Sequence, residues 1–581
     1  MDLIDGLDAA QREAVTSTAA PLCILAGAGS GKTRVLTRRI AYRVASGEAD
    51  AARVLALTFT RAAAAALRDR LAGLGVREQV AAGTFHAVAY AQLRRRWADH
   101  GLRAPALLER KTRLLASILG TDAVSRVADY ATEVEWAKAR MVTPASYEPA
   151  AESAGRTPPC PGARMAAVFE QYEAEKRRRG LVDFEDLLLA CAGALERDER
   201  FAAAQRWRFR HLFVDEFQDV NPAQFRLLRA WLGDRLDLCV VGDPDQAIYA
   251  WNGADPHLLT ALPRAFPTTG VVRLATNYRS TPQVVATASA VTDGDGDGRR
   301  DGAVRSVRAD GPVPSVRCYP TDRAETAGVV QGVRSAHRPG TPWRHIAVLA
   351  RTNAQLAPLE AALVADGVPH RCRGGAFLDR PAVESGMRAL RAGGPGVPFA
   401  SRVRDLIAMA DEASAADRLE LVELVRLARE YEALVDGAGP GGFVAWLRSA
   451  LGGAGEGAGG DAVAVTTFHR AKGLEWPVVF VTGLERGLVP VAYATTAAAL
   501  AEERRLLYVA LTRAVDELHC SWASERASSA GPQRREPSPW LSRIEAAIAD
   551  LAPGWSGPGD GPEAWREHVA ASRAELARIS R

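Results

Sequence analysis

The segment AGAGSGKT (26–33) constrains the fold of this chain more than any other feature of its sequence. It follows an apolar run, PLCILAG (21–27), and precedes a helical pattern. A glycine-rich turn between a strand and a helix directs successive backbone N–H groups and the helix N-terminus toward one point, where they can surround phosphate oxygens. In such a loop Lys32 reaches the phosphates and the Thr33 hydroxyl binds Mg²⁺. The segment therefore predicts a phosphate-binding loop between a strand and a helix.

An ordinary glycine turn is the alternative, because alanine and glycine are abundant here and the first position is Ala26 where the strict pattern has glycine. Lysine makes the match informative, since the chain has only five lysines among 73 lysines and arginines. The five are Lys32, Lys111, Lys138, Lys176 and Lys472. An accidental match is expected in roughly one such chain in a hundred. The predicted loop residues are Ala26, Gly27, Ala28, Gly29, Ser30, Gly31, Lys32 and Thr33.

Short apolar runs rich in β-branched residues recur along the chain and are separated by helical patterns. This alternation predicts an α/β fold with parallel sheets. The runs form two groups, which predicts two lobes, each interrupted by a mainly helical insertion. The expected parts are a first lobe (1–103 and 182–274) with its insertion (104–181), a second lobe (275–386 and 462–545) with a short insertion (387–461), and a tail (546–581).

Composition narrows the class of protein. Hydrophobic residues make up 48% of the chain and charged residues 24%, which excludes a wholly disordered or fibrous protein. No apolar stretch reaches about 18 residues, so we expect neither a signal peptide nor a membrane-spanning helix. The seven scattered cysteines argue against a disulfide framework or a local metal site. Because the net charge is only +4, nucleic acid has to be bound by local patches.

A pair of adjacent carboxylates supplies the acidic partner that a phosphate loop needs. The segment VDEFQD (214–219) ends another predicted strand. There Asp215 can hold Mg²⁺ through water, and Glu216 can orient and deprotonate the attacking water. An isolated Asp-Glu pair is usually a solvated strand end, but a phosphate loop in the same chain favours the catalytic interpretation.

Eight segments in order resemble the motifs of superfamily 1 DNA helicases of the UvrD/Rep/PcrA type, over about positions 3–523. Besides the phosphate loop, they are LDAAQREAV (7–15), LALTFTRAAAAALRDRL (55–71), GTFHAVAYAQLR (83–94), VVGDPDQAIYAWNGA (240–254), LATNYRSTPQVV (274–285), TTFHRAKGLEWPVVFVTGLERGLVP (466–490) and EERRLLYVALTRA (502–514). The resemblance implies two RecA-like lobes of the P-loop NTPase class that use ATP and Mg²⁺ and bind single-stranded DNA.

The resemblance also assigns residues to the nucleotide cleft. It implies that Gln11 reads the adenine edge and that Gln246 senses the γ-phosphate. Arg279 and Arg513 would act from the second lobe as arginine fingers, each worth roughly 10³ to 10⁵ in rate. Hydrolysis would then require closure of the cleft. The remaining nucleotide contacts are Arg34, Tyr278 and, near the ribose and γ-phosphate, Glu475.

In the family pattern six residues face DNA: Phe59, Thr84, His86, Tyr249, Trp251 and His469. Aromatic side chains there stack on bases, at about 1–3 kcal/mol per base and without sequence preference. Taken singly, Phe59 and Trp251 are more typical of a core, and lone histidines are usually structural. Only the motif positions favour DNA contact.

The chain departs from the family pattern at several positions. Arg61 and Ala62 stand where Asn-Lys is usual, and Asn252 replaces a frequent arginine, so some phosphate contacts must differ. Arg470 and Trp476 are also unusual but remove no catalytic group. The second insertion is far shorter than in UvrD, Rep or PcrA and lacks a Gly-Ile-Gly hairpin, which puts unwinding by this chain alone in question.

The expected function is an ATP-dependent 3′ to 5′ DNA helicase or single-stranded DNA translocase in DNA repair or replication. Its expected partners are single-stranded DNA, 3′-tailed duplex DNA and a recruiting or unwinding protein, with no membrane, in the bacterial cytoplasm at the nucleoid. One alternative is a translocase that needs a partner to unwind. The other is a non-motor DNA-binding subunit of a helicase–nuclease complex, against which the intact Lys32, Asp215, Glu216 and both arginines argue.

Overall fold

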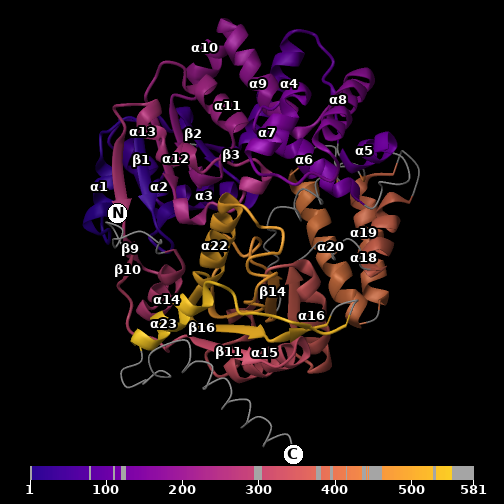
Figure 1. Cartoon of the computed structure of the whole chain (residues 1–581). Coiled ribbons are helices and arrows are strands. Elements are labelled where there is room, and N and C mark those ends of the chain that lie inside the picture. Colours follow the sequence, from indigo (N-terminus) through magenta and orange to yellow (C-terminus); the bar gives the residue numbers. More distant parts are fainter. Residues whose placement is uncertain are drawn as a thin grey trace, which may run out of the picture.

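The computed structural model describes residues 3–551 except 77–79, 109–110, 120–125, 293–303, 374–380, 393–396, 414, 435–439, 441–442, 444–460 and 528–530. Two six-stranded parallel sheets, each covered by helices on both faces, form two stacked lobes (Figure 1). The predicted α/β class with two lobes is confirmed. No described helix is long and apolar enough to cross a membrane.

The first sheet has the order β3-β2-β6-β7-β1-β8. Its strands are β3 (Ala81–Thr84), β2 (Val54–Thr58), β6 (His211–Val214), β7 (Leu238–Gly242), β1 (Leu22–Ala26) and β8 (Gly270–Leu274). Every residue of β2 is buried, as expected for a parallel strand with helices on both faces. Leu55 and Leu57 face one core and Val54 and Ala56 the other, because side chains alternate along a strand.

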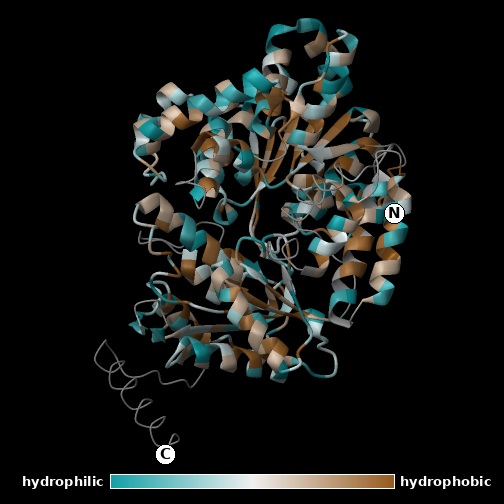
Figure 2. Cartoon of the chain, turned by 90° about the vertical axis from the view of Figure 1, so that its right-hand side faces the viewer, coloured by the Kyte–Doolittle hydropathy of each residue, from teal (hydrophilic) through white to brown (hydrophobic). Residues whose placement is uncertain are grey.

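Helices complete the two cores of the first lobe. One face carries α4 (Phe85–Asp99), α9 (Phe184–Arg197) and α11 (Pro222–Leu232), and α10 (Glu199–Arg208) packs on α9. The other face carries α1 (Ala9–Thr16), α2 (Lys32–Ala45) and α3 (Arg61–Gly73). Figure 2 shows hydrophobic residues gathered on the strands between these layers. Thr60 and Thr84 cap α3 and α4 with their hydroxyls, which starts both helices directly after strand ends.

The second sheet has the order β11-β16-β15-β12-β14-β13. Its strands are β11 (Ser315–Tyr319), β16 (Ala514–Ala523), β15 (Trp476–Val481), β12 (Ile346–Ala350), β14 (Val463–Thr467) and β13 (His370–Arg373). The helices α14 (Pro282–Thr292), α22 (Ala497–Leu511) and α23 (Leu541–Leu551) pack on one face, and α15 (Asp322–Ala336) and α16 (Leu356–Ala365) on the other.

Two helical groups interrupt the lobes and carry their own apolar clusters. The first contains α5 (Lys111–Leu119), α6 (Val127–Ala139), α7 (Tyr147–Ser153) and α8 (Gly162–Arg179). The second contains α18 (Pro381–Arg391), α19 (Phe399–Glu412) and α20 (Ala415–Leu434), which lie below α5 and α6 in Figure 1. The proposed domain limits remain predictions, and most of the predicted tail, 552–581, lies outside the described residues.

Candidate nucleotide cleft and nucleic-acid interface

The predicted phosphate loop joins β1 to α2 at the carboxyl edge of the first sheet. Gly29 and Gly31 adopt φ values of +69° and +82°, in the left-handed region that favours glycine. Lys32 Nζ donates to the Ala26 carbonyl at 3.2 Å, and Gln11 Nε2 donates to the Ser30 carbonyl at 2.9 Å. The loop, its lysine and the predicted adenine reader therefore lie together.

The two predicted carboxylates follow β6, which lies two strands away from β1 in the sheet. Thr33 Oγ1 donates to Asp215 Oδ2 at 3.1 Å, although 182 residues separate them. Burial, together with the adjacent Glu216, raises the pKa of Asp215 to about 6. Burial acts in the same direction on Glu216, but Lys32 and Lys472 outweigh it and lower the pKa of that carboxyl.

Glu216 also has an unusual backbone. Its φ of +52° lies in the left-handed region, which costs a non-glycine residue about 1–2 kcal/mol. Such conformations persist where surrounding contacts hold them, often at functional sites. Gln218 Nε2 donates to Glu216 Oε2, and Gln218 Oε1 accepts from the Asp243 N–H at 2.9 Å. Gln218 thus holds the Glu216 carboxylate in place, close enough to Lys32 for the ammonium to lower its pKa.

The second lobe meets the phosphate loop through β9 (Thr276–Asn277) and the residue that follows it. Asn277 Nδ2 donates to the Ala28 carbonyl at 2.8 Å, and the Tyr278 N–H donates to the Gly29 carbonyl at 2.9 Å. A Cβ on Gly29 would lie 2.6 Å from Asn277 Nδ2, so the close approach requires glycine. Tyr278 thereby borders the loop, and the guanidinium of Arg34 donates to the Gly6 carbonyl at 3.0 Å. The nucleotide contacts expected of both side chains stay predictions.

The two predicted arginine fingers are held within the second lobe. Arg279 forms an ion pair with Glu475, so two predicted nucleotide contacts are bound to each other. Arg513 is buried and donates to the carbonyls of Val509 and Leu474 at 2.9 and 3.1 Å. Burial and the nearby Arg279 lower the pKa of Arg513. The two guanidinium groups thus lie near one another, and Arg513 lies close enough to Glu216 to lower the pKa of that carboxyl.

The predicted γ-phosphate sensor lies on η5 (Pro244–Gln246), directly after β7. Gln246 Nε2 donates to Asp243 Oδ2 at 2.6 Å, and this carboxylate lies 3.7 Å from Lys32 Nζ. The Gln246 carbonyl accepts from Lys472 Nζ, also at 2.6 Å. A lysine of the second lobe therefore contacts the backbone of the sensor residue.

The six predicted DNA contacts fall into two groups. Tyr249, Trp251 and His469 lie together: the ring centroids of Tyr249 and Trp251 are 6.5 and 6.3 Å from that of His469. Trp251 is 43% exposed, which is unusual for a tryptophan and leaves its ring available to a ligand. The other group is Phe59, Thr84 and His86: Phe59 directly follows β2, Thr84 is the last residue of β3, and His86 lies in the first turn of α4.

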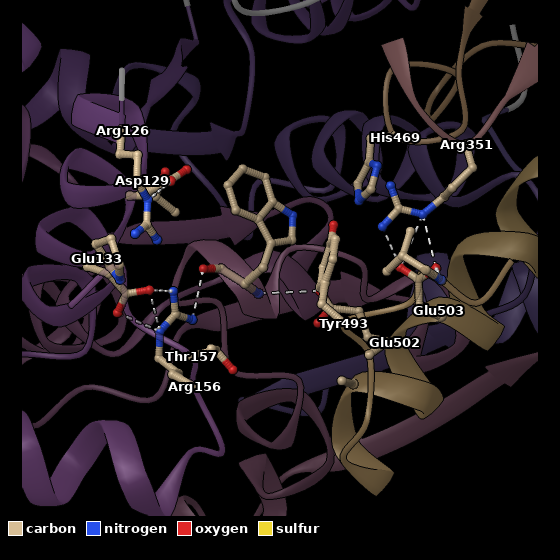
Figure 3. Close-up of a pocket in the computed structure, with 16 residues that line it drawn as sticks. Arg126, Asp129, Glu133, Arg156, Thr157, Arg351, His469, Tyr493, Glu502 and Glu503 are labelled. Carbon is tan, nitrogen blue, oxygen red and sulfur yellow. Dashed lines mark hydrogen bonds and ion pairs between the residues drawn. The ribbon is translucent and has the colours of Figure 1, made fainter. Parts of the chain in front are cut away.

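A pocket of about 490 Å³ opens between the first insertion and the second lobe, with Trp251 in its wall (Figure 3). Arg156 and Glu133 stand on one side and Arg351, His469 and Tyr493 on the other. The arginines are paired, Arg156 with Glu133 at 2.7 Å and Arg351 with Glu503 at 2.5 Å. Burial, with Arg351 and Lys472, lowers the pKa of His469 to about 3, so its imidazole is neutral.

Comparison with known proteins shows the family. Residues 7–267 match the UvrD/REP helicase N-terminal domain, and residues 272–392 and 400–525 match the UvrD-like helicase C-terminal domain. The chain belongs to the UvrD/Rep helicase family. It is 40% identical to the ATP-dependent DNA helicase UvrD2 of Mycobacterium tuberculosis H37Rv over 95% of this chain and 84% of that protein. It is 30% identical to UvrD1 of the same strain (94% and 86% covered) and 28% identical to DNA helicase II of Escherichia coli K12 (93% and 88%).

Sequence reasoning about this UvrD/Rep-family chain missed three side chains at the site. Lys472 and Asp219 lie inside recognised motifs, and the scarcity of lysine was a signal that could have marked Lys472. Tyr493 is 76% exposed and lines the pocket, but it stands in the stretch VPVAYATT, where nothing in the local pattern marks it.

Proposed function

We propose that this protein is an ATP-dependent DNA helicase or single-stranded DNA translocase in which ATP and Mg²⁺ bind between the two lobes. One observation supports this most directly. The phosphate loop and the Asp215–Glu216 pair of the first lobe lie opposite the second lobe, whose Arg513 lies near Glu216 and whose Arg279 lies near Arg513. A binding subunit with vestigial chemistry has no need for this full set of charged groups.

The residues present fit Mg²⁺ and a nucleotide. Thr33 Oγ1 and Asp215 Oδ2 are hard oxygen donors within 3.1 Å, which is the ligand type that Mg²⁺ prefers. Bound Mg²⁺ would neutralise charge that develops on the phosphates. Lys32 and the loop N–H groups would bind phosphate oxygens, and Gln11 would lie at the adenine edge. Glu216 would orient the attacking water and accept its proton.

Hydrolysis would depend on the second lobe. Arg279 would have to exchange Glu475 for the γ-phosphate, and Arg513 would approach from the same side. Each finger would contribute roughly 10³ to 10⁵ in rate, so turnover would be slow until the lobes adopt the closed arrangement. Closure and reopening would move the aromatic groups of the two lobes relative to each other along the strand. Movement from 3′ to 5′ is part of this proposal.

The pocket at Trp251 suits a base better than a phosphate. Four carboxylates and three guanidinium groups line it, so its charge does not attract an anion. Neutral His469 and the exposed rings of Trp251 and Tyr493 offer stacking surfaces instead. We therefore place one unstacked base of single-stranded DNA in this pocket, with the backbone outside it.

The short second insertion supports a second form of the motor, a translocase that unwinds only with a partner. Its described part includes three helices, α18 to α20, which share one apolar cluster. A forked duplex with a 3′ tail separates the two forms. Strand separation by the purified chain supports a helicase, and displacement of streptavidin from single strands without strand separation supports the partner-dependent translocase.

ATP hydrolysis with and without single-stranded DNA tests the motor itself, at one low and one moderate salt concentration because phosphate contacts are salt-sensitive. We expect DNA to stimulate the wild type and Glu216→Gln to lower the stimulated kcat by about 10² or more, because a positioned general base contributes that much. DNA binding by this variant should persist. A wild type that binds DNA without stimulated hydrolysis would instead be the non-motor subunit.

A further inference from the structure

Arg156 of the first insertion reaches the backbone of a residue that is expected to stack on DNA. Its Nη1 donates to the Trp251 carbonyl at 3.2 Å, although 95 residues separate the two in sequence. Trp251 lies on η6 (Ala250–Asn252) of the first lobe. Its side chain lines the pocket in Figure 3, while its carbonyl is bound from the side of the insertion.

The guanidinium of Arg156 is fixed by two further contacts. Its Nε and Nη2 donate to the Glu133 carboxylate at 3.0 and 2.7 Å, and its Cζ lies 4.5 Å from the centroid of the Trp136 ring, within cation–π range. Glu133 is fixed in turn, because it accepts from the buried Tyr147 hydroxyl at 2.6 Å. A planar guanidinium held by a bidentate pair directs its remaining nitrogen along one line. That nitrogen is Nη1, and it meets the Trp251 carbonyl.

Helix α6 supports the same loop at its C-terminal end. A Cβ on Gly253 would lie 2.6 Å from the Cβ of Ala139, so the loop packs on the helix with no room for a side chain. Gly253 also has a φ of +95°, in the left-handed region that favours glycine. Arg140, directly after α6, forms an ion pair with Asp255 at 3.7 Å. The insertion therefore contacts this stretch of the first lobe at three positions, of which Trp251 is the first.

Arg156 is poorly placed to bind a DNA phosphate itself. The Glu133 carboxylate occupies Nε and Nη2 and balances the charge, and the Trp251 carbonyl occupies Nη1. The Arg156 side chain is only 14% exposed. The loop 250–254 carries no cation of its own, so the contact with its backbone comes from the insertion. Arg156 can therefore act on DNA through the Trp251 ring more readily than as a counter-charge.

We propose that Arg156 is a positioning residue that holds Trp251 in the orientation needed to stack on a base of single-stranded DNA. The Glu133 pair and the Trp136 ring set the direction of the guanidinium, and its hydrogen bond fixes the backbone that carries the Trp251 ring. A ring fixed before binding loses less freedom when a base arrives. The inference rests on the proposed function, in which the pocket takes a base, and adds the first insertion as the part that shapes it.

Binding of labelled oligothymidine to the full chain, measured by fluorescence anisotropy, tests this role. In Arg156→Met we expect the Kd to rise about fivefold, less than in Trp251→Ala, which removes the stacked ring itself. The slope of log K against log salt should keep its wild-type value, because no phosphate contact is lost. The DNA concentration for half-maximal ATP hydrolysis should rise by the same factor while kcat at saturating DNA is reached in full, as expected when only binding is weakened.

Arg156→Lys separates position from charge. A lysine keeps the positive charge, but its ammonium cannot form the bidentate pair and hold the Trp251 carbonyl in the same fixed geometry. We therefore expect Arg156→Lys to be as impaired as Arg156→Met. Wild-type affinity in Arg156→Lys would overturn the proposal. A salt slope smaller by about one in Arg156→Met would also overturn it, because it would show a direct phosphate contact.

A double-mutant cycle with Trp251→Ala tests whether Arg156 acts through the ring. The double variant should bind DNA no more weakly than Trp251→Ala, and additive losses would contradict the proposal. Arg178→Met is the matched control, because Arg178 also donates to a glutamate through two nitrogens, to Glu175 at 2.7 and 2.6 Å, but is 70% exposed and does not line the pocket. It should bind DNA as the wild type does, and an equal loss there would overturn the role of Arg156.

The outcomes separate this inference from the proposed function. A wild type without DNA-stimulated hydrolysis contradicts the motor and leaves the binding measurements intact. Wild-type affinity in Trp251→Ala contradicts the base pocket and this inference with it, whereas a weakened Trp251→Ala beside an unchanged Arg156→Met contradicts only the role of Arg156. If Arg156→Met does not fold, Gly253→Ala decides, because a Cβ there displaces the loop from α6 and should also raise the Kd. Unchanged affinity in Gly253→Ala would then overturn the proposal.

Discussion

At the scale of single residues, burial and nearby charges shift the pKa values of the carboxyl groups at this site. Asp215 and Asp219 are both buried, and the pKa values of about 6 and 7 lie well above the ordinary 3.8 of an aspartate. Glu216 stands between them in sequence, yet two lysines lower the pKa of its carboxyl. Neighbouring carboxylates thereby become chemically distinct, which a cleft with separate metal and base roles requires.

Asp219 makes the stability of the protein depend on pH in a specific direction. Because its pKa is raised in the folded state, folded Asp219 binds a proton more readily than unfolded Asp219 between about pH 4 and pH 7. Its contribution to stability is therefore full below about pH 4 and is lost as the pH rises through about 7. Asp219→Asn lacks this titration, so its Tm relative to wild type should be higher at pH 8 than at pH 5, measured by thermal melts. An equal Tm difference at both values would contradict the assignment.

At the scale of elements, buried ion pairs join the first insertion to the lobe. Lys138 of α6 and Lys176 of α8 donate to Asp183, the N-cap of α9, at 2.7 and 2.8 Å. Oxygens of Glu173, Asp183 and Asp186 lie within 4.8 Å of one another, an arrangement that could hold a metal ion, but two ammonium groups already contact them. The cluster is a structural junction among three helices.

Helix α8 offers a matched pair of variants for this junction. Lys176→Met leaves Asp183 with one fewer cation in a buried site, and breaking such a pair costs about 3–5 kcal/mol. Arg178→Met on the same helix removes a 70% exposed partner of Glu175 and should not change stability measurably. Urea denaturation compares the two. Equal midpoints would show that the buried cluster does not hold the helices together.

At the scale of the whole molecule, the base pocket exists only where three parts of the chain meet. The first insertion supplies Arg156, the first lobe Trp251, and the second lobe His469 and Tyr493. Hydrogen bonds between side chains and backbone groups join these parts. The Arg156 side chain donates to the Trp251 carbonyl at 3.2 Å, and the Glu502 carboxylate of α22 accepts from the Ala250 N–H at 2.8 Å. A change in lobe spacing therefore alters the pocket directly.

Stacking in this pocket predicts a particular salt dependence. Trp251→Ala should weaken single-stranded DNA binding by about 1–3 kcal/mol, the cost of losing one stacked base. The slope of log K against log salt should stay unchanged, because that slope counts neutralised phosphates. Trp207→Ala is the control, since Trp207 is 65% exposed but lies on α10 under Arg53. Fluorescence anisotropy over a salt series measures both quantities, and a shallower slope for Trp251→Ala would indicate a phosphate contact instead.

The sequence by itself determined the features that depend on local order. Strands and helices have different hydrophobic periods, so both can be recognised in the sequence. Apolar runs that alternate with helical patterns predicted parallel sheets, and their two groups predicted two lobes; the structure confirms both. A glycine loop before a helix predicted a phosphate site at a strand end, and the ordered motifs predicted the family, which the comparisons confirm.

Only the tertiary structure decided which distant residues meet and how deeply they are buried. Lys472 and Asp219 are 253 residues apart, and no spacing rule joins them. Tyr493 lines the pocket only because the second lobe folds so as to bring it there. Arg279 forms an ion pair with Glu475, which its motif position does not indicate. Burial, which raises the pKa of Asp219 and lowers that of His469, is a property of the packed molecule. Contacts and pKa values depend on three-dimensional neighbours, and those neighbours exist only once both sheets have assembled.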